Sequence, residues 1–216
     1  GSLLSILEGR RLSGDRTIGF FTNGMVLRRE HIKAIMESSL KIETVFSVDG
    51  VGTSESFEYM RSGAKWETVK GNISLLSEAR RHSIYEGLKK VSVSTIIPHQ
   101  QAVPFHVPQQ EEIEETFKKE FGPLGIHEYY YRSIHRYNGQ IVMEGMPEKE
   151  MRNGPCCFVK RGGVSILVDG RVSVGCGDLT NRLIVGDLKN QTLEEIFYGD
   201  RVSSLRGMML SGERYK

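Results

Sequence analysis

Small polar and charged side chains follow three runs of β-branched or aromatic residues. The segments are Thr22-Asn23-Gly24, Ser47-Val48-Asp49-Gly50 and Pro98-His99-Gln100-Gln101. Because Ser47 and Asp49 are two positions apart, their side chains point to the same side of an extended strand. A hydroxyl beside a carboxylate is suited to binding the two hydroxyls of a ribose. A second interpretation stays open, in which Asp49-Gly50 is only a turn.

The three cysteines form a second group of residues with chemical potential. Cys156, Cys157 and Cys176 lie on either side of an Asp169-Gly170 turn signal. Their odd number and the adjacent pair do not fit a secreted disulfide framework. Their clustering in one short stretch of the C-terminal third can arise by chance or mark a shared site. A zinc site is disfavoured because all six histidines precede residue 136, and simple buried thiols are the remaining alternative.

The elements that position these residues alternate between strand and helix. Runs rich in β-branched and aromatic residues predict strands at 17–21, 44–48, 91–97 and 126–131. Apolar residues three or four positions apart predict helices between them, at 32–40, 66–76 and 110–121. This alternation is typical of an α/β fold, so we predict parallel strands in sequential order from Thr17 to about Arg132. Ligands of such folds bind at the carboxyl ends of the strands, where the polar segments lie.

The pattern changes after residue 140. A Gly-, Pro- and Met-rich stretch ends at Pro155, and the runs 164–168 and 172–174 flank Asp169-Gly170, which predicts a hairpin. A short helix is predicted after Thr192, a good N-cap residue. We therefore place the boundary between 140 and 155 and predict two domains, 1–145 and 146–216.

Composition restricts the class of protein. Of the 216 residues, 38% are hydrophobic and 26% are charged, which is ordinary for a globular protein. The net charge of +2, from 29 basic and 27 acidic residues, is too small to indicate nucleic-acid binding. No apolar run approaches the roughly 18 residues that span a bilayer, and no signal segment opens the chain. We expect a cytoplasmic enzyme or binding domain without a nucleic-acid or membrane partner.

The order of these motifs resembles that of the radical S-adenosylmethionine (radical SAM) enzymes. The N-terminal resemblance rests on Phe20-Phe21-Thr22-Asn23-Gly24, Val45-Phe46-Ser47-Val48-Asp49-Gly50, and Tyr59-Met60-Arg61-Ser62-Gly63 with the helix after it. The C-terminal part resembles the SPASM or twitch extension of that family. Its matching segments are Pro155-Cys156-Cys157, Ile166 to Val172, Cys176-Gly177-Asp178, Val185 to Leu188 and Leu193 to Ile196.

The resemblance implies a partial (β/α)6 barrel followed by a small α+β domain of the SPASM or twitch type with a β-hairpin. It also implies S-adenosylmethionine bound against a [4Fe–4S] cluster, whose reduced form cleaves it to a 5′-deoxyadenosyl radical that abstracts a substrate hydrogen. By this resemblance Ser47 and Asp49 contact the ribose, Arg61 the methionine carboxylate, and Asn23-Gly24 lie near the cofactor. A guanidinium suits a carboxylate because it donates two parallel hydrogen bonds, although a solvent-exposed helix arginine is the alternative for Arg61.

For the cysteines, the resemblance implies an auxiliary iron–sulfur cluster with Cys156 or Cys157 and Cys176 among its ligands. The implied substrate is a peptide or a small molecule, in peptide modification, natural-product biosynthesis or small-molecule oxidation. The implied electron donor is of the flavodoxin or ferredoxin type.

Two family motifs are not found in this sequence. They are the Cys-x3-Cys-x2-Cys motif of the catalytic cluster and the Gly-Gly-Glu segment, which belong before Leu3, since Leu3 to Leu12 matches the helix after the second strand. We therefore expect an excerpt of a longer enzyme that lacks its first strands and is inactive alone. The alternatives are a degenerate non-catalytic binding or scaffold relative, and an unrelated α/β carrier or transferase.

Overall fold

The structure is a computed structural model, and it describes residues 17–82, 87–133, 163–174, 178 and 180–211. The chain divides into two compact units, Gly1–Ile134 and His135–Lys216, which we describe separately. The predicted domain boundary and the predicted helix at 3–12 fall outside the described residues.

A four-stranded sheet forms the frame of the N-terminal unit. Its strands are β1 (Thr17–Thr22), β2 (Lys41–Ser47), β3 (Leu88–Ile97) and β4 (Tyr129–Ser133). They lie in the order β1-β2-β3-β4, and every neighbouring pair is parallel. This arrangement confirms the α/β class and the predicted sequential parallel strands.

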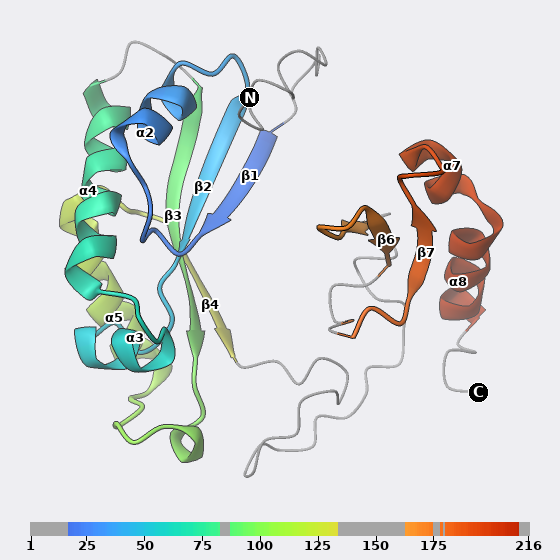
Figure 1. The fold of residues 1–216 in the computed structure, drawn as a ribbon. Coiled ribbons are helices and arrows are strands. Elements are labelled where there is room, and N and C mark those ends of the chain that lie inside the picture. Colours follow the sequence, from blue (N-terminus) through green and yellow to red (C-terminus); the bar gives the residue numbers. More distant parts are fainter. Residues whose placement is uncertain (1–16, 83–86, 134–162, 175–177, 179, 212–216) are drawn as a thin grey trace. The chain divides into compact units, whose positions relative to one another are not determined.

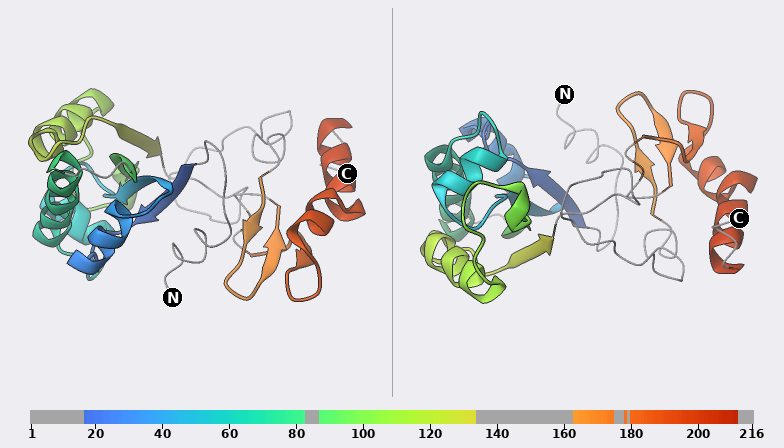
Figure 2. Two further views of the ribbon diagram at one scale, coloured as in Figure 1. Left: turned by 90° about the horizontal axis from the view of Figure 1, so that it is seen from above. Right: turned by 90° about the horizontal axis from the view of Figure 1, so that it is seen from below.

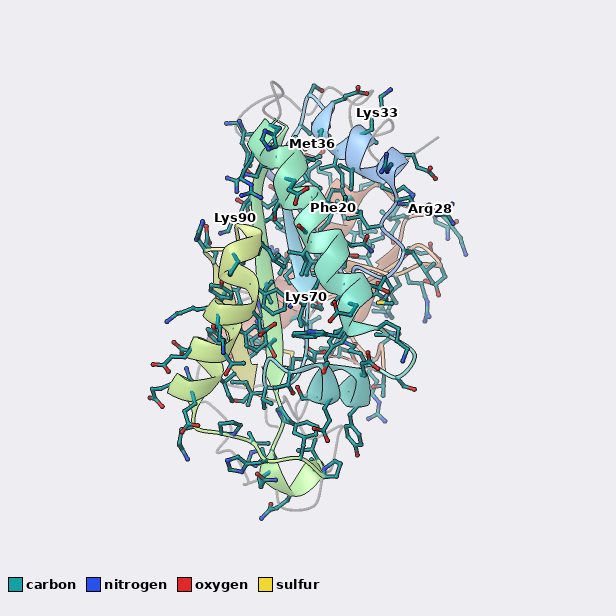
Figure 3. The ribbon with its side chains drawn as sticks, turned by 90° about the vertical axis from the view of Figure 1, so that its left-hand side faces the viewer. Phe20, Arg28, Lys33, Met36, Lys70 and Lys90 are labelled. Carbon is teal, nitrogen blue, oxygen red and sulfur yellow. The ribbon has the colours of Figure 1, made fainter. Side chains whose placement is uncertain are left out.

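Helices connect these strands, because a parallel pair needs a crossover. They are α2 (Arg29–Met36), α3 (Ser54–Met60), α4 (Trp66–His82) and α5 (Gln110–Phe121), with the short 3-10 turns η1 (Gln100–Ala102) and η2 (Gly122–Leu124). Helices α2, α4 and α5 lie on one side of the sheet (Figures 1 and 2). Figure 3 looks onto this helical side, where Met36 of α2 and Lys70 of α4 are labelled.

The apolar core lies between the sheet and these helices. Ile42 and Phe46 of β2 are fully buried in it. The helices contribute apolar side chains spaced three or four residues apart, which form one face of each helix. These side chains are Val69, Ile73 and Leu76 of α4 and Ile113, Phe117 and Phe121 of α5.

The opposite side of the sheet is largely polar. Side chains alternate between the two faces of a strand, so those between the core residues point to this side. This side also carries the apolar Phe21, Val45 and Ile96. Its polar residues, which we call the polar face, are Glu43, Ser47, Lys90, Ser92, Ser94, Tyr130 and Arg132. Parallel sheets are usually apolar on both faces because helices cover both. The number of polar residues on this side departs from that pattern.

The C-terminal unit contains a three-stranded antiparallel sheet and two helices. The strands are β5 (Ser165–Ile166), β6 (Arg171–Ser173) and β7 (Ile184–Asp187), and the helices are α7 (Leu193–Tyr198) and α8 (Asp200–Ser211). Strands β5 and β6 form a hairpin across Asp169-Gly170, and the Asp169 carboxylate accepts a hydrogen bond from the Arg171 N–H at 3.1 Å. The core of this unit consists of Val172, Val174, Val185, Ile196 and Val202.

Helix α7 begins at the predicted N-cap. The Thr192 hydroxyl oxygen accepts a hydrogen bond from the Glu195 N–H at 3.2 Å, and the Glu195 carboxylate accepts one from the Thr192 N–H at 2.7 Å. This reciprocal capping box satisfies backbone donors that a helix start leaves free. In the parts of the chain that the structure describes, no helix combines the length and apolar character needed to cross a membrane.

Candidate functional site

The candidate site lies where β2 ends. The backbone pairing of β2 with β3 continues past Ser47, the last residue of β2. The Val48 N–H donates to the Ser94 carbonyl at 2.8 Å, and the Gly50 N–H donates to the Ile96 carbonyl at 3.2 Å. These two bonds hold Asp49 between them at the carboxyl edge of the sheet. Since Val48 packs in the apolar core, the alternation of side chains places Ser47 and Asp49 on the other side.

The Asp49 carboxylate joins three elements of the N-terminal unit. Its Oδ1 accepts a hydrogen bond from the Ile96 N–H of β3 at 3.0 Å, and its Oδ2 accepts one from Arg61 Nε at 2.7 Å. The residue is only 8% exposed. Both carboxylate oxygens therefore have protein partners, and Asp49 does more in this fold than end a turn.

Arg61 is held at the C-terminal end of α3. Its N–H donates to the Phe57 carbonyl at 2.8 Å, and its carbonyl accepts from the Ala64 N–H at 2.8 Å, so its backbone belongs to the turn that ends the helix. Its side chain is 35% exposed. In the hydrogen bonds of the described residues the guanidinium uses Nε alone, which leaves Nη1 and Nη2 for another acceptor.

Ser47 is half-buried on the polar face and lies beside Ser94 of β3 in the sheet register. Among the described residues its hydroxyl makes no hydrogen bond. The hydroxyl of Ser47 and the Nη groups of Arg61 are thus donors that the described part of this edge leaves available. A carboxylate and a hydroxyl are the acceptors that suit them.

Asn23 and Gly24 follow β1 at the same edge of the sheet, and the structure gives both a local structural role. The Asn23 side-chain oxygen accepts a hydrogen bond from the Met25 N–H at 3.1 Å, and the Gly24 carbonyl accepts one from Asn72 Nδ2 at 2.6 Å. Gly24 is buried, and a Cβ at this position would lie 2.8 Å from Phe46. The cofactor contact predicted for this pair stays a prediction.

An ionic cluster on the polar face was not indicated by the sequence. Lys90 Nζ contacts the Glu128 carboxylate and donates to the Tyr130 hydroxyl at 2.8 Å, and it lies 5.4 Å from the centre of the Tyr130 ring. The hydrogen bonds to Glu128 and to Tyr130 raise the pKa of Lys90 above its ordinary value. In the sequence, the only signal for this cluster was that Lys90 comes just before a β-branched run. Its partners, Glu128 and Tyr130, are about 40 positions away and cannot be read from that signal.

The three cysteines of the predicted cluster site, Cys156, Cys157 and Cys176, lie outside the described residues. Within the described ranges, no three histidine, cysteine, aspartate or glutamate side chains are grouped so that they could hold a metal ion. The predicted iron–sulfur ligands therefore stay a prediction.

Asp178, two residues after Cys176, organises the connection between β6 and β7. Its carboxylate accepts hydrogen bonds from the Leu183 N–H at 2.7 Å, the Arg182 N–H at 3.0 Å and the Ser173 hydroxyl at 3.3 Å. Burial by itself would raise the pKa of Asp178, but these hydrogen bonds outweigh it and the pKa is lowered. The ionised carboxylate thus links Ser173 at the end of β6 to the backbone of Arg182 and Leu183 before β7.

The C-terminal part of the chain has a recognisable family relationship. Residues 156–216 match the SPASM family model, described as an iron-sulfur cluster-binding domain. The match begins at Cys156 and includes Cys176. This confirms the predicted resemblance of the C-terminal part to a SPASM extension, and it supports an iron–sulfur cofactor.

Solved structures of radical SAM enzymes resemble the fold. Streptococcus suis SuiB bound to S-adenosylmethionine has a TM-score of 0.50 at 12% identity, and the match covers 88% of this chain and 50% of that chain. BtrN in complex with AdoMet and 2-DOIA has a TM-score of 0.44 at 14% identity, covering 98% of this chain and 73% of that one. For anSMEcpe with bound AdoMet the TM-score is 0.45 at 14% identity, and the match covers 88% of this chain and 56% of that chain.

The matched region thus spans half the length of SuiB and about half to three quarters of the other two chains. No curated protein is significantly similar in sequence to this chain.

Proposed function

We propose that this chain is part of a radical SAM enzyme and binds S-adenosylmethionine at the carboxyl edge of β2, with Arg61 and Ser47 as ligands. The observation that carries the proposal is the Arg61 guanidinium. It is fixed at the strand end by Asp49 at 2.7 Å, while its two Nη groups have no partner among the described residues. The SAM-bound state of SuiB supports the choice of ligand.

The donors at this edge fit the chemical groups of S-adenosylmethionine. Arg61 offers two parallel N–H groups, which match the two oxygens of the methionine carboxylate. Ser47 offers a hydroxyl for the ribose. The proposed (β/α)6 barrel accounts for the two faces of the sheet, because the helices cover the outside and the polar face lines the inside.

Each resident side chain has a defined task in this proposal. Arg61 holds the carboxylate and Ser47 the ribose, so that the cofactor is positioned against the polar face. When bound and reduced by one electron from a [4Fe–4S] cluster, S-adenosylmethionine supplies a 5′-deoxyadenosyl radical that takes a hydrogen atom from the substrate.

We propose a peptide or small-molecule substrate, in peptide modification, natural-product biosynthesis or small-molecule oxidation, and an electron donor of the flavodoxin or ferredoxin type. We also propose that the C-terminal unit holds an auxiliary iron–sulfur cluster through Cys176 and one of Cys156 and Cys157. The SPASM match supports this second site because it covers all three cysteines.

Calorimetric titration of the anaerobically reconstituted full-length protein with S-adenosylmethionine tests the proposed function. Arg61→Ala should lower the affinity roughly ten- to a hundredfold, since a hydrogen bond to a charged group contributes about 1.5–3 kcal/mol. Lys65→Ala is the matched control, because it removes an exposed cation four residues away whose partner is Glu58 at 3.0 Å. No binding by the wild type, or equal affinity of wild type and Arg61→Ala, would overturn the proposal.

A further inference from the structure

We propose that Asp49 is a positioning residue that aims Arg61 at the carboxylate of the cofactor, and that it does not bind the ribose. This inference rests on the proposed binding of S-adenosylmethionine. It departs from the ribose contact expected from the sequence, and the reason is the set of partners that the structure gives to the Asp49 carboxylate.

Asp49 is a rigid anchor. Its neighbours on both sides donate backbone hydrogen bonds to β3, from Val48 to Ser94 at 2.8 Å and from Gly50 to Ile96 at 3.2 Å. Its own Oδ1 is held by the Ile96 N–H at 3.0 Å. Backbone and side chain are therefore both tied to the neighbouring strand, and the position of Oδ2 is set by the sheet.

Arg61 needs such an anchor. It lies at the end of a seven-residue helix, and its side chain is 35% exposed. A free arginine side chain samples many rotamers, and a ligand that binds it must restrict them. The 2.7 Å bond from Nε to Asp49 Oδ2 restricts them beforehand. Because Nε carries this bond, Nη1 and Nη2 stay available as a pair, which is the geometry that a carboxylate accepts.

The burial of Asp49 argues against direct contact with a ribose. With both oxygens already hydrogen-bonded and the residue 8% exposed, little of its carboxylate faces outward. The Ser47 hydroxyl, which has no partner among the described residues, is the better ribose donor at this edge.

A double-mutant cycle with S-adenosylmethionine separates the two roles. The variants Asp49→Ala, Arg61→Lys and the double variant are titrated in the reconstituted full-length protein. If Asp49 acts through Arg61, Asp49→Ala should lower the affinity about tenfold in the wild-type background and less than about twofold in the Arg61→Lys background. An equal loss in both backgrounds, or no loss in the wild-type background, would overturn the proposal.

The difference in affinity between S-adenosylmethionine and a second ligand is a readout that a purely structural role of Asp49 would not change. Methylthioadenosine keeps the ribose and adenine but lacks the carboxylate, so Asp49→Ala should leave its affinity unchanged. A tenfold loss for both ligands would assign Asp49 to the ribose. If Asp49→Ala does not fold, Asp49→Asn replaces it, because the amide keeps an oxygen for the Ile96 N–H while the charged bond to Arg61 is lost.

Glu58→Gln is the matched control, since it removes the other ion pair of α3, with Lys65 at 3.0 Å. It should change the affinity for neither ligand. Failure of the wild type to bind S-adenosylmethionine would refute the proposed function itself. Wild-type binding together with equal losses across the cycle would refute only the role of Asp49.

Discussion

Replacing Gly24 by alanine should destabilise the N-terminal unit, although Gly24 lies in a segment predicted to approach the cofactor. Its φ is +71°, and a Cβ would lie 2.8 Å from Phe46 Cδ1 and 2.8 Å from Val69 Cγ2. Both of these side chains are 0% exposed. Because a close-packed core has no free space, neither ring nor methyl group can retreat without disturbing its neighbours.

Two costs add at this position. A non-glycine residue in the left-handed region loses about 1 kcal/mol, and forcing a methyl group into a packed core loses about 1–3 kcal/mol. Gly24→Ala should therefore lower the free energy of unfolding by about 3 kcal/mol. The carbonyl of Gly24, which accepts from Asn72, would shift with it.

Urea unfolding followed by tryptophan fluorescence measures this loss. The chain has one tryptophan, Trp66, which is 5% exposed in the core of this unit. Gly63→Ala is the control for backbone strain, because Gly63 has a φ of +83° but no atom within 4 Å of its added Cβ. Gly19→Ala controls for the loss of a glycine alone, since it also has nothing within 4 Å and no positive φ.

We expect little change for Gly19→Ala, about 1 kcal/mol for Gly63→Ala and about 3 kcal/mol for Gly24→Ala. Equal losses for Gly24→Ala and Gly63→Ala would show that Phe46 and Val69 yield to the methyl group. The packing argument would then be wrong.

Two further predictions concern other parts of the fold. Tyr131→Phe should stabilise the N-terminal unit by about 1 kcal/mol at neutral pH, because the buried hydroxyl has no partner among the described residues. Burial, together with the charges of Glu114 and Tyr129, raises the pKa of Tyr131 to about 12. In the unfolded chain this phenol ionises near pH 10, so the free energy of unfolding of the wild type should fall between pH 10 and 12. The fall should be smaller for Tyr131→Phe. Parallel pH profiles of the two proteins in urea unfolding would contradict this. Gly186→Ala should destabilise the C-terminal unit by about 2 kcal/mol, since its Cβ would lie 2.5 Å from Ile196 Cγ1. The rate of proteolytic cleavage at sites C-terminal to residue 163 measures this loss of stability. An unchanged cleavage rate would refute the prediction.

Local patterns in the sequence determined the class of the fold. The alternation of β-branched runs with helical spacing predicted four parallel strands, and all four are present in sequential order. The sequence also predicted the helix N-cap at Thr192 and the hairpin turn at Asp169-Gly170, because a capping box and a hairpin turn are made by residues a few positions apart. The apolar spacing did not predict α3, which is only seven residues long and is started by its Thr53 cap.

The contacts that build the candidate site were decided by tertiary structure. Arg61 and Asp49 were each identified from the sequence, but their ion pair joins residues twelve positions apart. Asn72 reaches the Gly24 carbonyl across 48 positions, and Lys90 meets Tyr130 across 40. Such partners are chosen by strand register and helix packing, which bring distant residues together. Sequence spacing therefore identified Asp49 as a polar residue at a strand end, while the neighbouring strand and helix determined that its carboxylate holds an arginine.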